Sequence, residues 1–266
     1  MSRLLGERFT AVVGPDRVVL ARRAGWRRPP QLHAQAECAA PTARAALAAL
    51  AELLARPEIG RGDLTIVLSN HFVQYVLLPW RAEVNGPAEL AAYAGILFDE
   101  TFGNEAGGRE ILIGRERAGS ARIAAGIDAT LLHGLRNAVG ASKLKLVSVQ
   151  PYLSAAFDRV RRKVGSRDFM FVLAEPARSC VLVATGGRWR SLRNTGTGAQ
   201  PHELAHLIER EAQLAGLADE GMPPVFVHVP GNDALKVPPC QGVTPRTVGL
   251  PHGATDPLLA MALTVN

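Results

Sequence analysis

Apolar residues along this chain fall into short runs of strand length and into longer stretches with helical spacing. The run Leu64–Leu68 is almost entirely apolar, as expected for a strand that is buried on both faces. Residues 71–78 are rich in β-branched and aromatic side chains, and they end at Pro79, which cannot donate a ladder hydrogen bond. We therefore expect two strands, joined by a tight turn at Ser69 and Asn70, inside a sheet that is covered by helices.

The rest of the hydrophobic pattern predicts one order of elements twice. In the first half, three strands, a helix and a fourth strand are expected at residues 9–13, 17–23, 31–39, 41–55 and 64–68. In the second half, the same order is expected at residues 169–174, 180–185, 189–194, 202–214 and 225–229. This is the element order of ribonuclease-H-type folds, so the pattern indicates two related α/β lobes.

The segment between these halves predicts further elements. They are a helix, a hairpin, a helix capped by Asp128, a strand and a helix, at residues 87–102, 110–126, 129–139, 144–149 and 151–164. The charged stretch 163–167 marks the best boundary. We expect a first lobe at 1–164, which includes an inserted subdomain around 81–164, and a second lobe at 165–266. Beyond residue 231 the chain reads as loop until a short helix at 258–263.

Three blocks of the sequence resemble a known family. They read VLSNHFVQYVLLPW with a following FDETFG, AAGIDATLLHGLRNAV with LKLVSVQPYLSAAFDR, and the terminal DPLLAMAL. These blocks are similar to the PilM, MshI and GspL cytoplasmic-domain group, the assembly-platform proteins of type IV pili and type II secretion. The resemblance spans most of the chain, although its motifs are structural and apolar.

This resemblance implies an α/β, two-lobed, actin-like (ribonuclease-H-type) fold with mixed sheets flanked by helices. It also implies a non-catalytic cytoplasmic adaptor that binds the short cytoplasmic tail of a bitopic inner-membrane protein. Such a peptide binds in a groove between strands and helices or adds along a sheet edge. A secretion or pilus motor ATPase is a further expected partner, and the protein is expected at the inner membrane through its partners.

Composition agrees with a folded chain in a reducing compartment. Of 266 residues, 47% are apolar and 20% charged, which is typical of a globular protein. No apolar run reaches the ~18 residues of a membrane span. Glu7 and Arg8 interrupt the first residues, so we expect neither a signal peptide nor a transmembrane span. The three cysteines are scattered without the spacing of a zinc site.

The net charge of +6 permits an anionic partner. Because the arginines are spread widely, we expect no nucleic acid. The densest basic cluster is made of Arg22, Arg23, Arg27 and Arg28. Two readings of this cluster stay open: it is a solvated hairpin tip, or it is a patch that contacts a partner or the anionic membrane surface.

The resemblance also implies where an actin-like nucleotide site would lie, and the first position departs from it. An Asp-x-Gly turn after the first strand should hold the metal and the phosphates. Here Val12 stands at the Asp position, and Pro15 removes an amide donor near Gly14. Asp16 could replace the missing carboxylate only by a register shift.

The second turn and the late strand depart in the same way. Ala174 stands at the Asp position and Pro176 at the Gly position, while the late strand ends with Gly231 alone where two glycines are expected. Weak nucleotide-binding candidates are therefore Gly14, Asp16, Glu175 and Gly231. We expect no cofactor, and a degenerate actin-like nucleotide-binding protein or ATPase is the alternative function.

Catalytic motifs give one further alternative. His202-Glu203-Leu204-Ala205-His206 is a literal HExxH, in which two histidines bind zinc and the glutamate activates water. Pro201 places His202 in the first helical turn, and no HxxGxxH extension follows. We therefore expect no metal, with His202 and His206 as weak ligand candidates of a zinc peptidase. The sequence contains no convincing Ser-His-Asp order or nucleophile elbow, and no catalytic residue is assigned.

Overall fold

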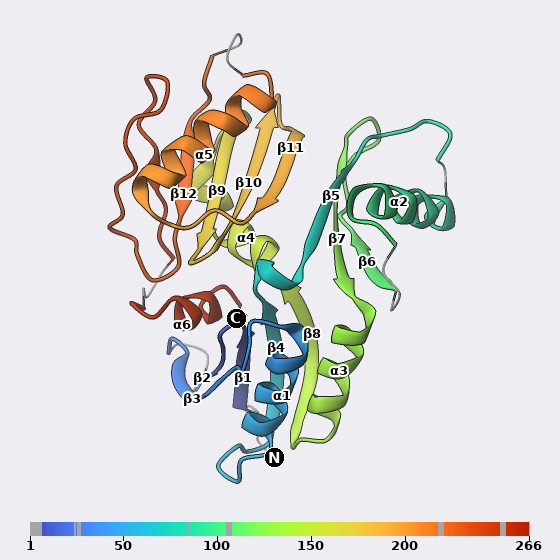
Figure 1. Ribbon diagram of the computed structural model, residues 1–266, viewed down its shortest axis with the longest axis vertical. Helices are drawn as coiled ribbons and strands as arrows, with labels where there is room; N and C mark the ends of the chain where they lie inside the picture. Colours follow the sequence, from blue (N-terminus) through green and yellow to red (C-terminus); the bar gives the residue numbers. More distant parts are fainter. Residues whose placement is uncertain are drawn as a thin grey trace.

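Two five-stranded mixed sheets and one three-stranded sheet form the framework of the protein (Figure 1). The computed structural model describes residues 7–23, 25, 28–84, 86–104, 108–217, 221–250 and 254–265. In Figure 1 one of the two larger sheets lies in the lower lobe and the other in the upper lobe, with the small sheet beside the upper lobe. The chain is therefore an α/β protein of two lobes with a small subdomain attached to the first.

The first lobe contains a sheet of three antiparallel strands continued by two parallel ones. Its strands, in spatial order, are β3 (Gln31–Glu37), β2 (Arg17–Arg23), β1 (Glu7–Val13), β4 (Gly62–Leu68) and β8 (Leu144–Pro151). Leu64, Ile66 and Leu68 are completely buried, as the apolar run of β4 predicts. β4 lies between β1 and β8, so the most apolar strand has a neighbour on each side.

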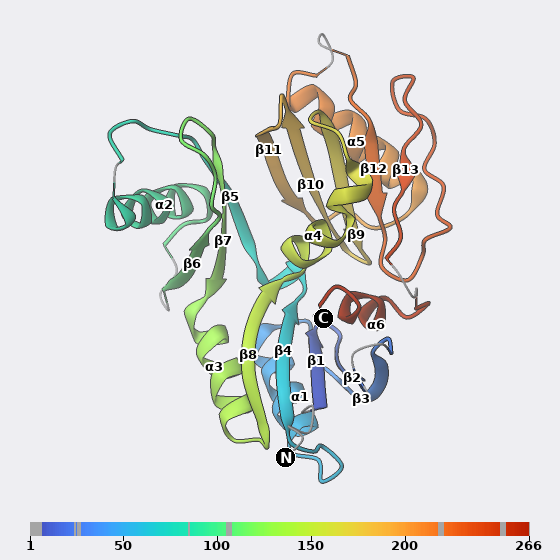
Figure 2. The ribbon, with the colours of Figure 1, turned by 180° about the vertical axis from the view of Figure 1, so that it is seen from behind.

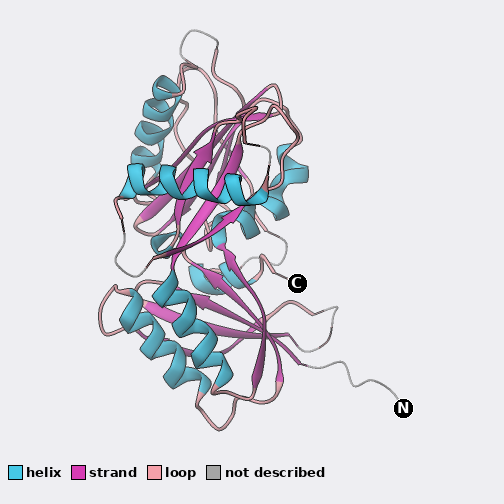
Figure 3. Cartoon of the chain, turned by 90° about the vertical axis from the view of Figure 1, so that its right-hand side faces the viewer, coloured by secondary structure: helices cyan, strands magenta, loops and turns pink. Residues whose placement is uncertain are grey.

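Two helices of this lobe lie against each other beside the sheet. They are α1 (Ala43–Leu54), capped by Thr42, and α3 (Ala129–Gly140), capped by the predicted Asp128. A Cβ on Gly134 would lie 2.5 Å from a methyl carbon of Leu47, so the glycine permits the close approach of the two helices. Figure 3 shows both helices on one flank of the lower lobe.

The second lobe repeats the topology of the first. Its strands, in spatial order, are β11 (Arg188–Thr195), β10 (Arg178–Thr185), β9 (Phe169–Glu175), β12 (Val225–His228) and β13 (Arg246–Thr247). Helix α5 (Pro201–Leu214) packs on the face that carries Met170 and Val172. Helix α4 (Tyr152–Val164) packs on the opposite face, where Phe157 contacts Phe171. The predicted pair of related lobes is thus present, and β13 lies in a stretch that we expected to be loop.

The small subdomain consists of a three-stranded sheet and one helix. Its elements are β5 (Gln74–Leu78), β7 (Arg122–Asp128), β6 (Arg109–Ile113) and α2 (Pro87–Phe102), and the sheet order is β5-β7-β6. The expected bounds around 81–164 differ at both ends, because β5 belongs to the subdomain while α3 and β8 return to the first lobe. Strands β4 and β5 are not a hairpin, because the 3-10 turn Asn70–Phe72 directs them into different sheets.

The final helix of the chain belongs to the first lobe. Helix α6 (Pro257–Ala262) contacts β1 and β2, and Met261 and Ala262 are buried in the core that these strands share (Figure 2). The expected division at 165–266 therefore assigns this helix to the wrong lobe, since its apolar residues are buried against the first sheet. Within the described parts of the chain, no helix has the length and hydropathy required to cross a bilayer.

Candidate functional site

The first candidate turn is covered by α6. The amide of Gly14 donates to the carbonyl oxygen of Arg17 at 3.1 Å, which closes the β1–β2 hairpin. A Cβ on Gly14 would lie 3.1 Å from a methyl carbon of Leu258, and Arg17 pairs with Asp256 at the start of α6. Asp16 is exposed on the surface. The amide of Gly14 is therefore already hydrogen-bonded within the hairpin, and the turn packs against α6.

The second candidate turn places its carboxylate in the contact between the lobes. Glu175 ends β9, is 2% exposed, and accepts hydrogen bonds from the hydroxyl of Ser69 and from the amide of Asn70 at 2.9 Å. Asn70 also accepts, at its side-chain oxygen, from the Tyr75 hydroxyl at 2.6 Å. Asn194 of β11 donates to the carbonyl oxygen of Asn70 at 2.9 Å. A buried polar network thus joins the two lobes around Asn70.

Burial controls the protonation of this carboxyl group. Desolvation raises the pKa of Glu175 to about 7, while the hydrogen bonds from Ser69 and Asn70 and the charge of Arg178 act in the lowering direction. The group is therefore partly protonated near neutral pH. This carboxyl group is therefore part of the contact between the lobes.

A second buried pair joins the first residue of α4 to the last residue of β12. The hydroxyl of Tyr152 lies 2.9 Å from Nε2 of His228, and Nδ1 of His228 lies 2.9 Å from the carbonyl oxygen of Val248. With Nδ1 donating to Val248, Nε2 accepts from Tyr152, which requires a neutral imidazole. Desolvation lowers the pKa of His228 in agreement with this assignment. Helix α4 is thereby tied to the end of β12.

A cavity of about 710 Å³ lies at the carboxyl end of the second sheet, next to the turn after β9. Pro176, Gly198, Glu203, Gly231 and Thr255 are among the residues that line it. A Cβ on Gly231, which has φ +80°, would lie 2.6 Å from the carbonyl oxygen of Thr255, so the segment before α6 closes over this glycine. None of the described lining residues is Lys or Arg, whereas Glu203 adds a carboxylate.

The four nucleotide candidates are thus not gathered around one ligand space. Gly231 lines the cavity, Glu175 is buried between the lobes, and Asp16 is on the surface beside Gly14, which contacts α6. A phosphate in the cavity would meet the charge of Glu203 without a compensating cation among the described lining residues. In the sequence Glu203 stands out only as the glutamate of the HExxH motif, so its position at the wall of this cavity was not predicted.

The two histidines of the HExxH motif lie one turn apart on the exposed side of α5. His202 and His206 are exposed on α5, and Glu203 lies close to the loop at Gly198. No cluster of three or more metal-binding side chains occurs among the described residues. Glu220, a carboxylate that follows the motif in the sequence and would be a possible third zinc ligand, lies outside the described residues.

The basic candidates are distributed over more than one surface. Arg22 and Arg23 are the last residues of β2, not part of a hairpin tip, and successive strand residues point to opposite faces. Arg22 pairs with Glu7, whereas desolvation and the nearby charges of Arg159 and Arg8 lower the pKa of Arg23. Arg28 is exposed, and Arg27 lies outside the described residues.

An apolar groove, which the sequence did not reveal, runs between the small subdomain and the rest of the protein. It consists of two adjoining hollows of about 370 Å³ and 260 Å³ that share Leu112, Ala125 and Pro151. We call it the edge groove, lined by residues 110–114, 116, 123, 125, 127, 132, 136, 146–149, 151, 153, 154, 157, 158, 182 and 189.

Two sheet edges border this groove. β6 is the edge strand of the small sheet and β8 is the edge strand of the first sheet, so each has only one neighbouring strand. Leu112 on β6 is 70% exposed and Val147 on β8 is 59% exposed, although both are large apolar residues on strands. Exposed apolar side chains beside free strand edges are typical of surfaces that bind another chain. The alternation of apolar and polar residues along β6 and β8 is the sequence signal for these strands. It does not show which face of each strand is exposed to solvent.

Comparisons with known proteins come from structure alone. No protein-family model matches the sequence, and no curated protein matches it either. The cytoplasmic domain of EpsL, an inner-membrane component of the type II secretion system of Vibrio cholerae, superposes with TM-score 0.60 at 12% identity, covering 98% of this chain and 96% of that one. A PilM–PilN type IV pilus biogenesis complex gives TM-score 0.57 at 15% identity, covering 99% and 98%.

A third similar structure gives the fold its general name. A protein of Bacteroides thetaiotaomicron, described as having an actin-like ATPase fold and unknown function, superposes with TM-score 0.58 at 10% identity, covering 86% of this chain and 84% of that one. At these identities the likeness concerns the fold. The two lobes with repeated topology and the small subdomain together form an α/β protein with the actin-like ATPase fold.

Proposed function

We propose that this protein is a non-catalytic cytoplasmic adaptor in the assembly platform of a pilus or a type II-like secretion system. Its task is to bind the cytoplasmic tail of a bitopic inner-membrane protein, and through that partner it is held at the membrane. The observation that carries this proposal is the edge groove, which combines free strand edges with exposed apolar side chains.

The groove suits a short extended peptide. Peptide backbone can add to the free edge of β6 or β8, and alternate side chains can enter the two hollows around Leu112. Charged residues of both signs, Glu110 and Arg136, lie at the first hollow, while Glu116 and Asp158 lie at the second. The apolar interior supplies affinity and these charges select the direction of the peptide.

The arrangement of residues between the two lobes supports a non-catalytic role. In this protein the first turn faces α6, Glu175 joins the two lobes, and Glu203 lines the remaining cavity. Similar folds include an inner-membrane component of type II secretion and PilM in a complex with PilN, both proteins of the assembly class proposed here.

The proposal is tested with synthetic peptides for the cytoplasmic tails of any bitopic membrane proteins that the genes beside this one encode. Calorimetry on the full chain should give saturable binding to one of them. Leu112→Glu and Val147→Glu place a charge in the groove and should each weaken binding at least tenfold, about 1.4 kcal/mol. Because both side chains are exposed, neither substitution should reduce the free energy of unfolding appreciably.

Matched controls are available on other surfaces. Ile96 on α2 is 58% exposed and Leu214 on α5 is 61% exposed, and both lie outside the edge groove. Ile96→Glu and Leu214→Glu should leave peptide binding within twofold of the original protein. The adaptor proposal is wrong if no tail peptide binds at about 100 μM, which is weaker than about −5.5 kcal/mol. It is also wrong if the groove variants bind as well as the controls.

A further inference from the structure

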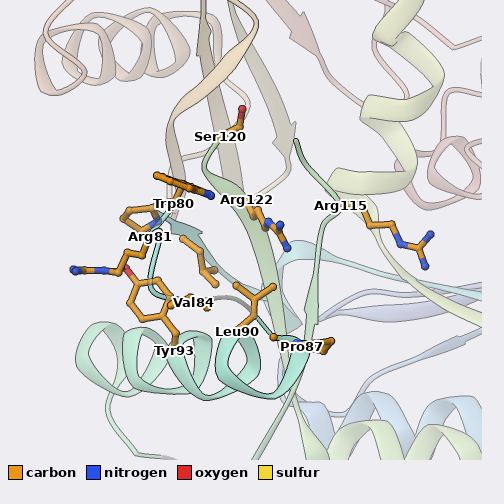
Figure 4. A pocket seen from close by; sticks show the side chains of 12 residues that line it. Trp80, Arg81, Val84, Pro87, Leu90, Tyr93, Arg115, Ser120 and Arg122 are labelled. Carbon is orange, nitrogen blue, oxygen red and sulfur yellow. The ribbon is translucent and has the colours of Figure 1, made fainter. Parts of the chain in front are cut away.

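A pocket of about 460 Å³ lies at the end of the small subdomain, between the end of β5, the start of α2 and the β6–β7 connection (Figure 4). We call it the arginine pocket, after Trp80, Arg81, Leu90, Tyr93, Arg115 and Arg122, which are among its lining residues. It shares no lining residue with the edge groove. It is therefore a separate surface, and the inference drawn from it does not rest on the adaptor proposal.

The charge of this pocket is one-sided. Three arginines line it, and none of its described lining residues is Asp or Glu. Among the described residues, no carboxylate lies within ion-pair distance of Arg115 or Arg122. Arg81 has the carboxylate of Glu83 nearby, so the excess of positive charge lies at Arg115 and Arg122, and such an excess raises the local concentration of anions. The pocket is therefore suited to a negatively charged ligand.

One of the three arginines is held in place by an aromatic ring. Nε of Arg81 donates to the Tyr93 hydroxyl at 3.0 Å, and its guanidinium lies 5.3 Å from the centre of the Tyr93 ring. Figure 4 shows Tyr93 and Leu90 projecting from α2 toward the strand ends, with Trp80 across from them. A guanidinium that is already oriented loses less side-chain entropy when it binds a carboxylate.

The walls of the pocket are apolar. Leu78, Val84, Pro87 and Leu90 line it together with the Trp80 side chain, and Trp80 is 49% exposed. Trp, Tyr and Arg are the residue types enriched at energetic centres of protein interfaces, whereas Lys, Glu and Asp are depleted there. The pocket joins these three types around an apolar floor, so it offers both a site for an apolar anchor and guanidinium partners for nearby carboxylates.

We propose that the arginine pocket docks an acidic segment of a protein partner, with an apolar or aromatic side chain of that segment inserted beside Trp80 and Leu90. Arg115 and Arg122 bind the flanking carboxylates. Single-stranded nucleic acid fits less well, because it needs successive aromatic platforms along a basic track, and Figure 4 shows both aromatic side chains of the pocket, Trp80 and Tyr93, on one side of it. The edge groove and the arginine pocket can be occupied at the same time, because no residue is common to both.

The probe for this proposal is a fluorescein-labelled synthetic peptide in which Asp and Glu alternate with Leu and Trp. Its partner probe has the same sequence with Asn and Gln in place of the acids. Fluorescence anisotropy with the full chain should show saturable binding of the acidic peptide and at least tenfold weaker binding of the amide peptide. Raising the salt concentration from about 50 mM to about 500 mM should strongly weaken the binding of the acidic peptide.

Variants locate the binding. Arg115→Gln and Arg122→Gln should each lower the affinity for the acidic peptide at least fivefold. Arg117→Gln is the matched control, because Arg117 is an exposed residue of the same connection and does not line the pocket. Leu112→Glu in the edge groove should also leave this binding unchanged. If Arg122→Gln reduces folding, as judged by its thermal unfolding, exposed Arg115 decides the question by itself.

Outcomes of three kinds would overturn the proposal. The first is an acidic peptide that shows no saturation up to about 1 mM, an affinity weaker than about −4.1 kcal/mol. The second is equal binding of the amide peptide, or an equal loss in Arg117→Gln. The third is a single-stranded oligonucleotide of the same net charge that binds more tightly and is lost in the same arginine variants, which would assign the pocket to nucleic acid.

Discussion

The side chain of Glu175, at the end of a strand in the second lobe, accepts a hydrogen bond at 2.9 Å from the backbone amide of Asn70 in the first lobe. The Ser69 hydroxyl bonds the other carboxyl oxygen. Both Asn70 and Glu175 are almost completely buried. A titratable group therefore lies at the contact that fixes the relative position of the lobes, so the stability of this contact depends on pH.

The pKa of Glu175, about 7, lies above its ordinary value of 4.5. Between these two pH values the folded protein binds more protons at this group than the unfolded chain, so its contribution to stability falls as pH rises. The contribution is fully present below pH 4.5 and is lost as the pH rises through about 7, a change of about 1 to 3 kcal/mol. Urea unfolding at several pH values between these limits measures it.

The control for this prediction is Glu175→Gln. The amide can accept from the Asn70 amide and donate to the Ser69 oxygen, but it does not titrate. Buried His228, whose pKa is lowered, acts in the opposite direction, so only the difference between protein and variant isolates Glu175. If this difference in unfolding free energy is constant across the pH range, the protonation of Glu175 has no part in the lobe contact.

Tyr152→Phe should reduce the free energy of unfolding by about 1 to 2 kcal/mol, because it removes the hydroxyl that His228 Nε2 accepts from and leaves that nitrogen unpaired in the interior. Denaturant unfolding measures the change. Tyr93→Phe is the comparison: the Tyr93 hydroxyl accepts from Arg81 at the surface, and its loss should cost less than about 0.5 kcal/mol. Equal costs for both variants would contradict the importance of the buried pair.

The protein should bind ATP with Mg²⁺ weakly or not at all. Position 12 is valine, the Gly14 amide is engaged with Arg17, and Glu203 lines the cavity at the second sheet. Calorimetry should detect no dissociation constant below about 100 μM, roughly −5.5 kcal/mol. Tight, saturable binding of the nucleotide would instead favour the degenerate nucleotide-binding protein over the adaptor.

The purified protein should hold no stoichiometric zinc. His202 and His206 are exposed one turn apart on α5, and a zinc site requires further ligands. Elemental analysis after gel filtration measures the metal, and His206→Ala should change the free energy of unfolding by less than about 0.5 kcal/mol. One zinc ion per chain that disappears in His206→Ala would restore the peptidase alternative.

The main architecture could be read from the sequence where local and tertiary preferences agree. The apolar run of β4 is a central strand, and Asp128 accepts from the Leu131 amide at 2.9 Å, as the expected cap of α3. The repeated element order also gave the second lobe. In each case a pattern of a few neighbouring residues contains the information.

The membership of strands in sheets could not be read in the same way. Strands β4 and β5 are adjacent in sequence, but the turn at Asn70–Phe72 separates them into different sheets. The short strand β13 pairs through only two residues, Arg246 and Thr247, which is below any periodic signal. The sheet to which each of these strands belongs is decided by hydrogen bonding with strands that are distant in the sequence.

The candidate surfaces were the least predictable part. The edge groove needs Leu112, Val147 and Trp189 to come together from three elements, and the orientation of each strand decides which side chains are exposed. The sequence places Glu175 among the nucleotide-site candidates because it directly precedes the turn after β9. Its actual partners, Ser69 and Asn70, are about a hundred positions earlier in the chain.

The position of α6 has a consequence for the order in which the protein folds during synthesis. Met261 and Ala262 complete the core of the first lobe against β1 and β2, yet they are made after every strand of the second lobe. While the ribosome is still producing the second lobe, the surface of β1 and β2 that α6 will cover has no cover from this helix. The lobe that is begun first is therefore the lobe whose core closes last.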